Sequence, residues 1–455
     1  MANKSHKKQT FSSKAGLIAA TVGSAVGLGN IWRFPAETQA NGGAAFLILY
    51  MGCVILLGIP VMLAEFSIGR AGHSDAVGCL RNLGASKGWR GVGALAVIAS
   101  YLILCFYMVV AGWTWEYLWQ SVTGELFEGA GGDMKAVFAA RMKEYISTTW
   151  KPLWATFIMI AVNTGILICG VQKGIERLSN ILMPLLFLLL AVFCVKSLSL
   201  PEAAAGVSFF LHPDWSVVTP GTLLNALGQA FFSLSLGMGI LVTYASYFPK
   251  DTRLTRTAIT VSLLDMLVAV MMGLIIFPAV MTFDLQGEGI AGATLVFVTL
   301  PEVFMQMPGT RVWSVLFFLL LTVAALTSTI SIAEVSVAFI RDRFRMSRTK
   351  AVLVVMTPLL LLSSVCSLSQ GVLSGVTISG RNIFDFLDTL ATNMMLPLVS
   401  IGLCVWLGWF APKGLLNSQL SNHGTLRTWL IAPVRFIIRY IAPPLILIVF
   451  ICAFL

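Results

Sequence analysis

Residues 21–35, TVGSAVGLGNIWRFP, decide the fold of this chain. They carry Gly23, Gly27 and Gly29 inside an apolar segment that ends at Pro35. Each glycine inside a helix costs about 1 kcal/mol relative to alanine, so this cluster predicts a helix that unwinds. Backbone groups freed inside a bilayer are tolerated only where protein or a wet cavity satisfies them. The stretch therefore predicts a ligand-binding break, and the alternative is close helix packing through small residues.

The surrounding composition is that of an integral membrane protein. The 455 residues are 57% apolar and 11% charged, with a mean hydropathy of +0.87, whereas soluble domains carry about 25% charged residues. A helix needs about 20 apolar residues to cross a bilayer, and the apolar runs are continuous rather than alternating, which excludes barrel strands. Eleven stretches are predicted to cross, namely 15–38, 43–69, 91–122, 152–171, 174–198, 221–247, 255–285, 309–340, 350–368, 383–410 and 430–454.

The net charge of +10 follows the positive-inside rule rather than indicating a nucleic-acid partner. Most Lys and Arg residues fall in the segments that are cytoplasmic if the N-terminus is inside. An odd number of crossings then places the C-terminus on the periplasmic side. The eight cysteines lie mostly within the crossings, so no disulfide framework is expected, and the first 14 residues show no signal-peptide cleavage pattern.

A second glycine cluster lies in the sixth predicted crossing. Residues 228–239 read GQAFFSLSLGMG and carry Gly228, Gly237 and Gly239. The first and sixth crossings are five apart, as expected for two five-helix inverted repeats whose broken helices form one site. We therefore expect an all-α membrane protein with a single transporter domain over 1–455. Repeat one covers about 14–200, repeat two about 221–410, and an extra helix about 430–455.

Four motifs together resemble the neurotransmitter:sodium symporters. They are SAVGLGNIWRFP at 24–35, NGGAAF at 41–46, FFSLSLGMG at 231–239 and ALTSTISI at 325–332. The match runs in order along nearly the whole chain and is similar to bacterial members with eleven helices. The resemblance implies sodium-driven uptake of amino acids by alternating access across a bacterial inner membrane. It also implies two sodium ions as cosubstrates, while the oligomeric state stays open.

The resemblance implies a ligand set for each sodium ion. The first ion would bind Ala25, Asn30, Ser233 and Asp265; the second would bind Gly23, Val26, Ala324, Thr327 and Ser328. Carbonyl, amide, hydroxyl and carboxylate oxygens suit a hard cation. The alternative for the last two hydroxyls is a bond back to their own helix.

Asp265 departs from the neutral Asn that family members usually carry. A carboxylate within a membrane is costly unless it is paired with charge. We expect Asp265 both to bind sodium and to supply the negative charge that a bound chloride supplies in animal members, so that uptake needs no chloride. The alternative is a carboxylate that lines water at the end of a crossing.

The substrate, by resemblance, lies between crossings 1, 3, 6 and 8. The implied contacts are Ala25, Gly27, Leu28, Gly29, Ile103, Tyr107, Phe232, Ser233, Ser235, Met238, Ser328 and Ile332. Monoamine transporters of the family place Asp where this chain has Gly27, so the substrate here should bring its own carboxylate. The lining of the side-chain pocket is uncharged, which predicts neutral apolar or aromatic amino acids as substrates. Met238 is flexible and can repack around side chains of differing shape, which favours acceptance of a broad range of these substrates.

The resemblance also implies gates and a hinge. The outer gate would pair Arg33 with Asp388 near Gln229, and the inner gate would pair Lys8 with Asp342, braced by Tyr247. Lys in place of the usual Arg, and Phe11 in place of Trp, weaken the case for the inner gate. Gly174 and Pro184 would let the fifth crossing unwind, and a static kink is the alternative. Glu65 should brace freed amides, and Glu334 is either a proton site or exposed to water.

An enzyme is not expected. The sequence has no nucleophile–base set, phosphate-binding glycine loop or Cys/His metal cluster, and all four histidines lie outside the crossings. Two further functions remain open at this stage. One is sodium-coupled uptake of another carboxylated amine, of the betaine or amino-butyrate type, and the other is an amino-acid sensor that binds without transporting.

Overall fold

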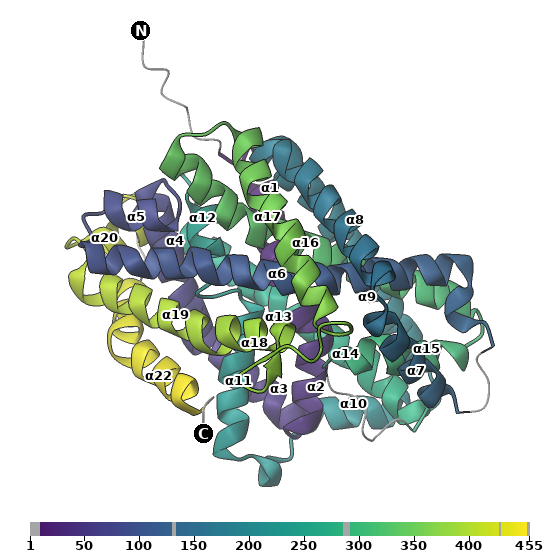
Figure 1. Ribbon diagram of the computed structural model, residues 1–455. Coiled ribbons are helices and arrows are strands. Elements are labelled where there is room, and N and C mark those ends of the chain that lie inside the picture. Colours follow the sequence, from purple (N-terminus) through teal and green to yellow (C-terminus); the bar gives the residue numbers. More distant parts are fainter. Residues whose placement is uncertain (1–9, 130–132, 285–291, 427–428, 453–455) are drawn as a thin grey trace.

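The computed structural model describes residues 10–129, 133–284, 292–426 and 429–452. Most of them are helical (Figure 1). The helical segments that match the predicted crossings are, in order, α1 (Lys14–Ala25) with η1 (Gly29–Arg33) and α2 (Phe34–Ala40); α3 (Ala44–Cys53), η2 (Val54–Gly58) and α4 (Ile59–Gly72); α6 (Lys87–Thr123); α8 (Trp150–Ile168); η4 (Val171–Glu176) and α9 (Arg177–Leu198); α11 (Pro220–Ser233) and α12 (Ile240–Ala245); α13 (Leu254–Thr282); α16 (Thr310–Phe344); α17 (Arg348–Leu368); α18 (Ile383–Asp388), η7 (Thr389–Met395), α19 (Leu396–Val405) and η8 (Trp406–Phe410); and α21 (Ile431–Phe436), η9 (Ile437–Ile441) and α22 (Ala442–Cys452).

Shorter elements connect them. These are α5 (Ala76–Asn82), η3 (Glu125–Phe127), α7 (Met134–Ser147), α10 (Ala203–Leu211), η5 (Trp215–Val217), α14 (Gly292–Thr294), η6 (Leu295–Thr299), α15 (Leu300–Met305), α20 (Leu415–Leu420) and a small antiparallel hairpin of β1 (Thr377–Ile378) and β2 (Arg381–Asn382). In Figure 1, α5, α12 and α20 gather at one end of the bundle, at the upper left, whereas α7, α10, α14 and α15 gather at the other. This division agrees with the inner and outer sides expected from charge.

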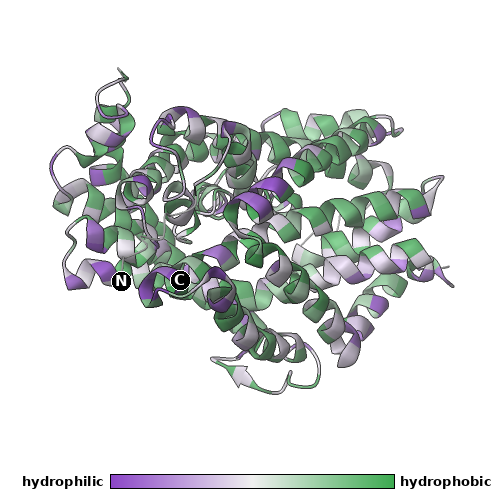
Figure 2. Cartoon of the chain, turned by 90° about the horizontal axis from the view of Figure 1, so that it is seen from above, coloured by the Kyte–Doolittle hydropathy of each residue, from purple (hydrophilic) through white to green (hydrophobic). Residues whose placement is uncertain are grey.

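Nine helical segments among the described residues are long and apolar enough to cross a membrane, and counting the bent first pair makes ten. The remaining predicted crossing, 221–247, is divided between α11 and α12, each too short to cross alone. Large apolar side chains point outward on the long helices, such as Leu56, Val195 and Leu361, which are 64%, 72% and 74% exposed. Figure 2 shows that most of the helical ribbon consists of hydrophobic residues, as membrane-crossing helices require.

Both predicted breaks are present. The axis bends by 52° between α1 and the η1–α2 segment, and Val26 at the bend is extended, with φ −71° and ψ 108°. Between α11 and α12, Ser235, Gly237 and Gly239 have positive φ values of 54°, 76° and 71°. Glycine adopts this conformation at little cost, whereas a serine there is uncommon. Both helices are thus interrupted where the sequence predicts, and at the second break two glycines adopt positive φ values.

Candidate binding site between the broken helices

The two breaks lie against each other, and side chains satisfy several of their backbone groups. Gln229 Nε2 donates to the Gly29 carbonyl at 3.1 Å, and Ser235 Oγ donates to the Ser24 carbonyl at 2.8 Å. The buried Glu65 carboxylate accepts the Gly237 N–H at 2.8 Å. The expectation that Glu65 braces freed amides is therefore confirmed for the second break. Polar groups at these breaks are held in place by protein contacts rather than by helix hydrogen bonds.

Asp265 lies fully buried in α13 at the centre of a polar cluster. Its Oδ2 atom accepts from Ser233 Oγ at 2.6 Å and from Tyr50 OH at 3.0 Å, and its Oδ1 atom accepts from Asn30 Nδ2 at 2.8 Å. The structure thus brings together all three side chains predicted for the first sodium ion. Hydroxyl, amide and carboxylate oxygens of this kind suit a hard cation. The alternative, a carboxylate lining water at the end of a crossing, is wrong because the group is buried.

Tyr50 in α3 is a member of this cluster that the sequence reasoning missed. It is fully buried, and its hydroxyl also lies 3.1 Å from Ser233 Oγ. A tyrosine inside an apolar crossing usually seeks a partner for its hydroxyl. The sequence could therefore indicate that the Tyr50 hydroxyl has a partner. It could not identify Asp265 as that partner, because Asp265 lies in a helix far away in the sequence.

The residues predicted for the second sodium ion lie where α1 meets α16. A β-carbon added at Gly23 would lie 3.3 Å from the Thr327 β-carbon, so the two backbones approach closely. Thr327 Oγ1 lies 3.0 Å from the Ala324 carbonyl and 3.2 Å from that of Val323, bonding within its own helix. A hydroxyl that donates in this way keeps its lone pairs for a cation. The helix-internal bond and the ion-binding role are therefore compatible.

The predicted substrate contacts surround the first break. Leu28 N–H donates to the Tyr107 hydroxyl at 3.2 Å. A β-carbon at Gly27 would lie only 2.5 Å from Ser328 Oγ and 3.1 Å from Tyr107 OH, so a larger residue would displace them. The remaining predicted pocket residues Ile103, Met238 and Ile332 are at least 96% buried, while Phe232 is partly exposed.

A cavity of about 960 Å³ extends from these residues toward α7 and α14. It is lined at one end by Leu28, Gly29, Tyr107 and Phe232 and farther out by Arg33 and Asp388. The two predicted gate residues therefore share one cavity, but the described residues show no ion pair between them. Arg33 Nε instead lies 3.8 Å from Glu37, and its guanidinium lies 4.8 Å from the centre of the Phe232 ring.

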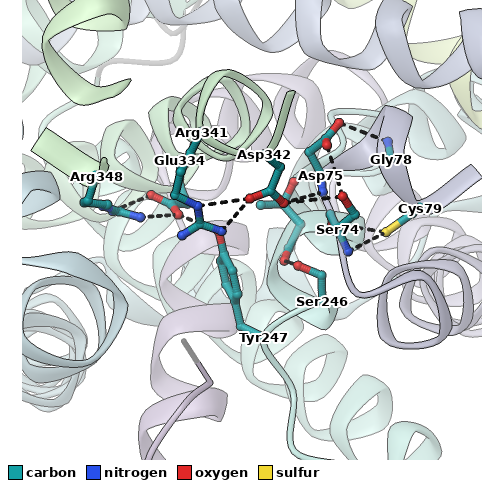
Figure 3. Close-up of polar contacts among 11 residues, drawn as sticks. Ser74, Asp75, Gly78, Cys79, Ser246, Tyr247, Glu334, Arg341, Asp342 and Arg348 are labelled. Carbon is teal, nitrogen blue, oxygen red and sulfur yellow. Dashed lines mark hydrogen bonds and ion pairs between the residues drawn. The ribbon is translucent and has the colours of Figure 1, made fainter. Parts of the chain in front are cut away.

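Figure 3 shows the residues around the predicted inner gate. Lys8 lies outside the described residues, so its pairing with Asp342 stays a prediction. Asp342 pairs with the adjacent Arg341 at 3.0 Å, and Tyr247 donates to Glu334 at 2.7 Å. Arg348 donates two hydrogen bonds to the same Glu334 carboxylate, from Nη1 to Oε1 at 2.7 Å and from Nη2 to Oε2 at 2.6 Å.

The expectation for Glu334 is corrected in one respect. Exposure to water is wrong, because its side chain is fully buried and ion-paired. Nearby, Asp342 also accepts the Asp75 N–H at 3.2 Å. Burial raises the pKa of Asp75, and the neighbouring Asp342 charge adds to the rise, whereas the N–H groups of Gly78 and Val77 oppose it. The inner end of the bundle therefore carries a connected network of charges.

The predicted hinge residues lie in the fifth crossing. Gly174 lies within the wide turn η4, where a β-carbon would overlap the Ile166 carbonyl. Pro184 lies inside α9, where it cannot donate the usual helix hydrogen bond. Gly174 thus also permits close packing of η4 on α8. A static kink and a mobile hinge would both have this geometry.

Comparison with known proteins decides the family. The model of the sodium:neurotransmitter symporter family matches residues 8–131 and 135–455. The chain belongs to this family. It is 35% identical over 449 residues to the uncharacterized sodium-dependent transporter YhdH of Bacillus subtilis, covering 98% of this chain and 97% of the relative. A sodium- and chloride-dependent GABA transporter of Drosophila melanogaster is 23% identical over 91% of this chain and 48% of its own length.

A solved structure agrees with the fold. The crystal structure of MhsT in complex with L-phenylalanine superposes with a TM-score of 0.88 and 42% identity, covering 98% of this chain and 100% of that one. The chain is therefore a sodium-dependent, multi-pass membrane transporter and not an enzyme. Its bacterial relatives include a second uncharacterized sodium-dependent transporter, from Haemophilus influenzae, with 32% identity over 99% of both chains.

Proposed function

We propose that this protein imports neutral apolar or aromatic L-amino acids together with sodium, by alternating access. The observation that carries the proposal is the buried Asp265–Ser233–Asn30 cluster beside the break in the first crossing. It offers oxygen ligands for a cation next to backbone amides that can meet a carboxylate. A sodium ion and an amino acid bound side by side would stabilise each other, which is the physical basis of coupled uptake.

The crowding at Gly27 supports a substrate that carries its own carboxylate. An aspartate there, which would pair with a carboxylate-free amine, has no room without moving Ser328 and Tyr107. The amides of Leu28 and Gly29 and the Tyr107 hydroxyl are proposed to receive the substrate carboxylate. The substrate amine would meet the carbonyls of Ala25 and Phe232 and, at the second break, Ser233 and Ser235.

An apolar pocket supports the proposed substrate class. Ile103, Met238 and Ile332 are buried and uncharged, and MhsT, the structural relative, is described with bound L-phenylalanine. A charged side chain would lose its hydration there without gaining a partner. We therefore propose leucine-like and aromatic amino acids as substrates.

Chloride independence rests on Asp265. Its carboxylate is fully buried and receives three hydrogen bonds, but the described residues place no Lys or Arg within ion-pair distance of it. A sodium ion at this cluster would supply the missing positive charge. A second anion is then unnecessary, and the second ion is proposed to lie between Gly23, Val26, Ala324, Thr327 and Ser328.

Alternating access is supported by the unequal ends of the molecule. A large cavity reaches the proposed site from the side of α7 and α14. On the opposite side, Glu334 is paired with Arg348 and accepts from Tyr247, and Asp342 accepts the Asp75 N–H. In the proposed cycle Arg33 leaves Glu37 and pairs with Asp388 to close the outer side. Gly174 and Pro184 then let the fifth crossing unwind as the inner side opens.

Equilibrium binding tests the substrate class. The purified protein is titrated with radiolabelled L-phenylalanine in sodium chloride, sodium gluconate and potassium chloride. We expect binding in both sodium buffers and none in potassium, with competition by leucine but not by GABA or betaine. Preferential competition by betaine or GABA would reject the amino-acid class in favour of another carboxylated amine. Loss of binding in gluconate would reject the role given to Asp265.

A further inference from the structure

Glu176, at the end of η4, holds the beginning of α1. Its side chain is buried, with 2% of the residue exposed. The carboxylate accepts four hydrogen bonds from two consecutive serines. Ser12 donates through its N–H and its hydroxyl, both at 2.8 Å, and Ser13 donates through its N–H at 3.0 Å and its hydroxyl at 2.9 Å. Segments 164 residues apart are thus joined at one side chain.

The chemistry of this contact makes it strong. Hydrogen bonds to a carboxylate are about twice as strong as those between neutral groups. Ser13 is also the N-cap of α1, where its hydroxyl accepts the Gly16 N–H at 2.9 Å, so the carboxylate faces the positive end of the helix dipole. A β-carbon at Gly16 would overlap Glu176, so the carboxylate lies directly on the helix. The four contacts fix both the position and the direction of α1.

The same segment lies on the inner half of the second broken crossing. The Phe11 N–H donates to the Tyr247 carbonyl at 3.0 Å, and the Phe11 ring is buried. One residue earlier, the Thr10 carbonyl accepts from Gln172 of η4 at 2.7 Å. Residues 10–13 therefore lie between η4 and the segment that follows α12. Their departure would uncover the inner side of the site.

We propose that Glu176 is a positioning residue that couples unwinding of η4 to release of α1. Gly174 lies two residues before it in the same wide turn, and such turns inside helices often occur at functional sites. Unwinding at Gly174 carries the carboxylate away from Ser12 and Ser13. Release of the serines in turn removes four contacts that hold η4. The inference rests on the proposed function, because it assigns the trigger for inward opening to one side chain.

Hydrogen–deuterium exchange in nanodiscs tests the coupling without relying on transport. The variants are Glu176→Gln, the double variant Ser12→Ala/Ser13→Ala, and the control Glu202→Gln, which alters an exposed loop carboxylate. In sodium, both site variants should exchange at least tenfold faster at residues 10–16 and also at 171–176. The control should match the parent. Faster exchange in only one segment, or in neither, would overturn the proposal.

A second measurement separates this inference from the proposed function. Glu176→Gln should bind L-phenylalanine in sodium within threefold of the parent, because the substrate contacts are unchanged. If the parent protein neither binds nor accumulates amino acids while exchange remains coupled, the proposed function fails and the coupling stands. If Glu176→Gln aggregates, the serine double variant decides the matter alone, since it keeps the carboxylate and removes only two hydroxyls.

Discussion

Replacing Asp265 by asparagine should weaken sodium binding while preserving the fold. The asparagine oxygen can still accept from Tyr50 and Ser233, which now donate to Oδ2 at 3.0 and 2.6 Å. The new amide nitrogen would face Asn30 Nδ2, and a flip of the Asn30 amide removes that conflict. The flip gives up the Nδ2 donations to Ser233 Oγ at 2.9 Å and to the Asp265 carbonyl at 3.3 Å, together with the 3.4 Å contact from the Gly27 N–H. The hydrogen bonds of Tyr50 and Ser233 to residue 265 are kept, and the fixed charge is lost.

The size of the effect follows from that charge. Two unit charges about 4 Å apart interact by about 4 kcal/mol at an effective dielectric constant of about 20. The asparagine oxygen retains part of this attraction, so we expect a loss of about 1.5 to 3 kcal/mol, which is about a tenfold to hundredfold weaker sodium affinity. The assay is the sodium dependence of L-phenylalanine binding at constant ionic strength, with choline as the replacement cation.

The matched control is Asp214→Asn, which removes one negative charge from an exposed loop. It should leave the sodium dependence within twofold of the parent. If Asp265→Asn also stays within twofold, the carboxylate does not bind sodium and the reasoning is refuted. Restoration of tight sodium binding by added chloride, in the variant only, would support the view that Asp265 replaces an anion.

Three further predictions concern other parts of the site. Gly27→Asp should abolish L-phenylalanine binding, because a carboxylate would displace Ser328 and repel that of the substrate; binding within threefold of the parent would contradict this. Glu334→Gln should loosen the inner side, since it disrupts the pair of hydrogen bonds that Arg348 donates to this carboxylate. A cysteine introduced near the inner end should then react with a polar maleimide at least fivefold faster than in the parent. An unchanged rate would argue against a gate. Pro184→Ala should leave binding within twofold but slow uptake at least fivefold, and equal losses of both would reject a hinge.

The fold was largely predictable from the sequence because its signals are local. Continuous apolar stretches mark the helices, and glycine clusters mark the breaks. The bend of 52° at Val26 lies within the quoted stretch. The sequence marks 221–247 as one apolar stretch, whereas the structure divides it into α11 and α12, each too short to be counted as a crossing by its length.

The contacts within the site were less predictable because they join distant segments. Tyr50 contacts Asp265 across 215 residues. From the sequence alone, an aromatic residue in an apolar helix is equally consistent with ordinary helix packing. The partner of Glu334 is Arg348, which follows it beyond the turn between two helices. The partner of Arg33 was also not predicted. In the present arrangement it is Glu37 on the next turn rather than Asp388 across the cavity.

Potential-driven uptake into proteoliposomes tests the central claim most directly. Vesicles loaded with potassium are diluted into sodium medium with radiolabelled L-phenylalanine, and valinomycin sets an inside-negative potential of about 100 mV, worth about 2.3 kcal/mol per charge moved. A sodium-coupled symporter should accumulate the amino acid severalfold above its outside concentration, and replacing external sodium by choline should remove this accumulation. Sodium-dependent binding with no accumulation would contradict the account and identify the protein as a sensor.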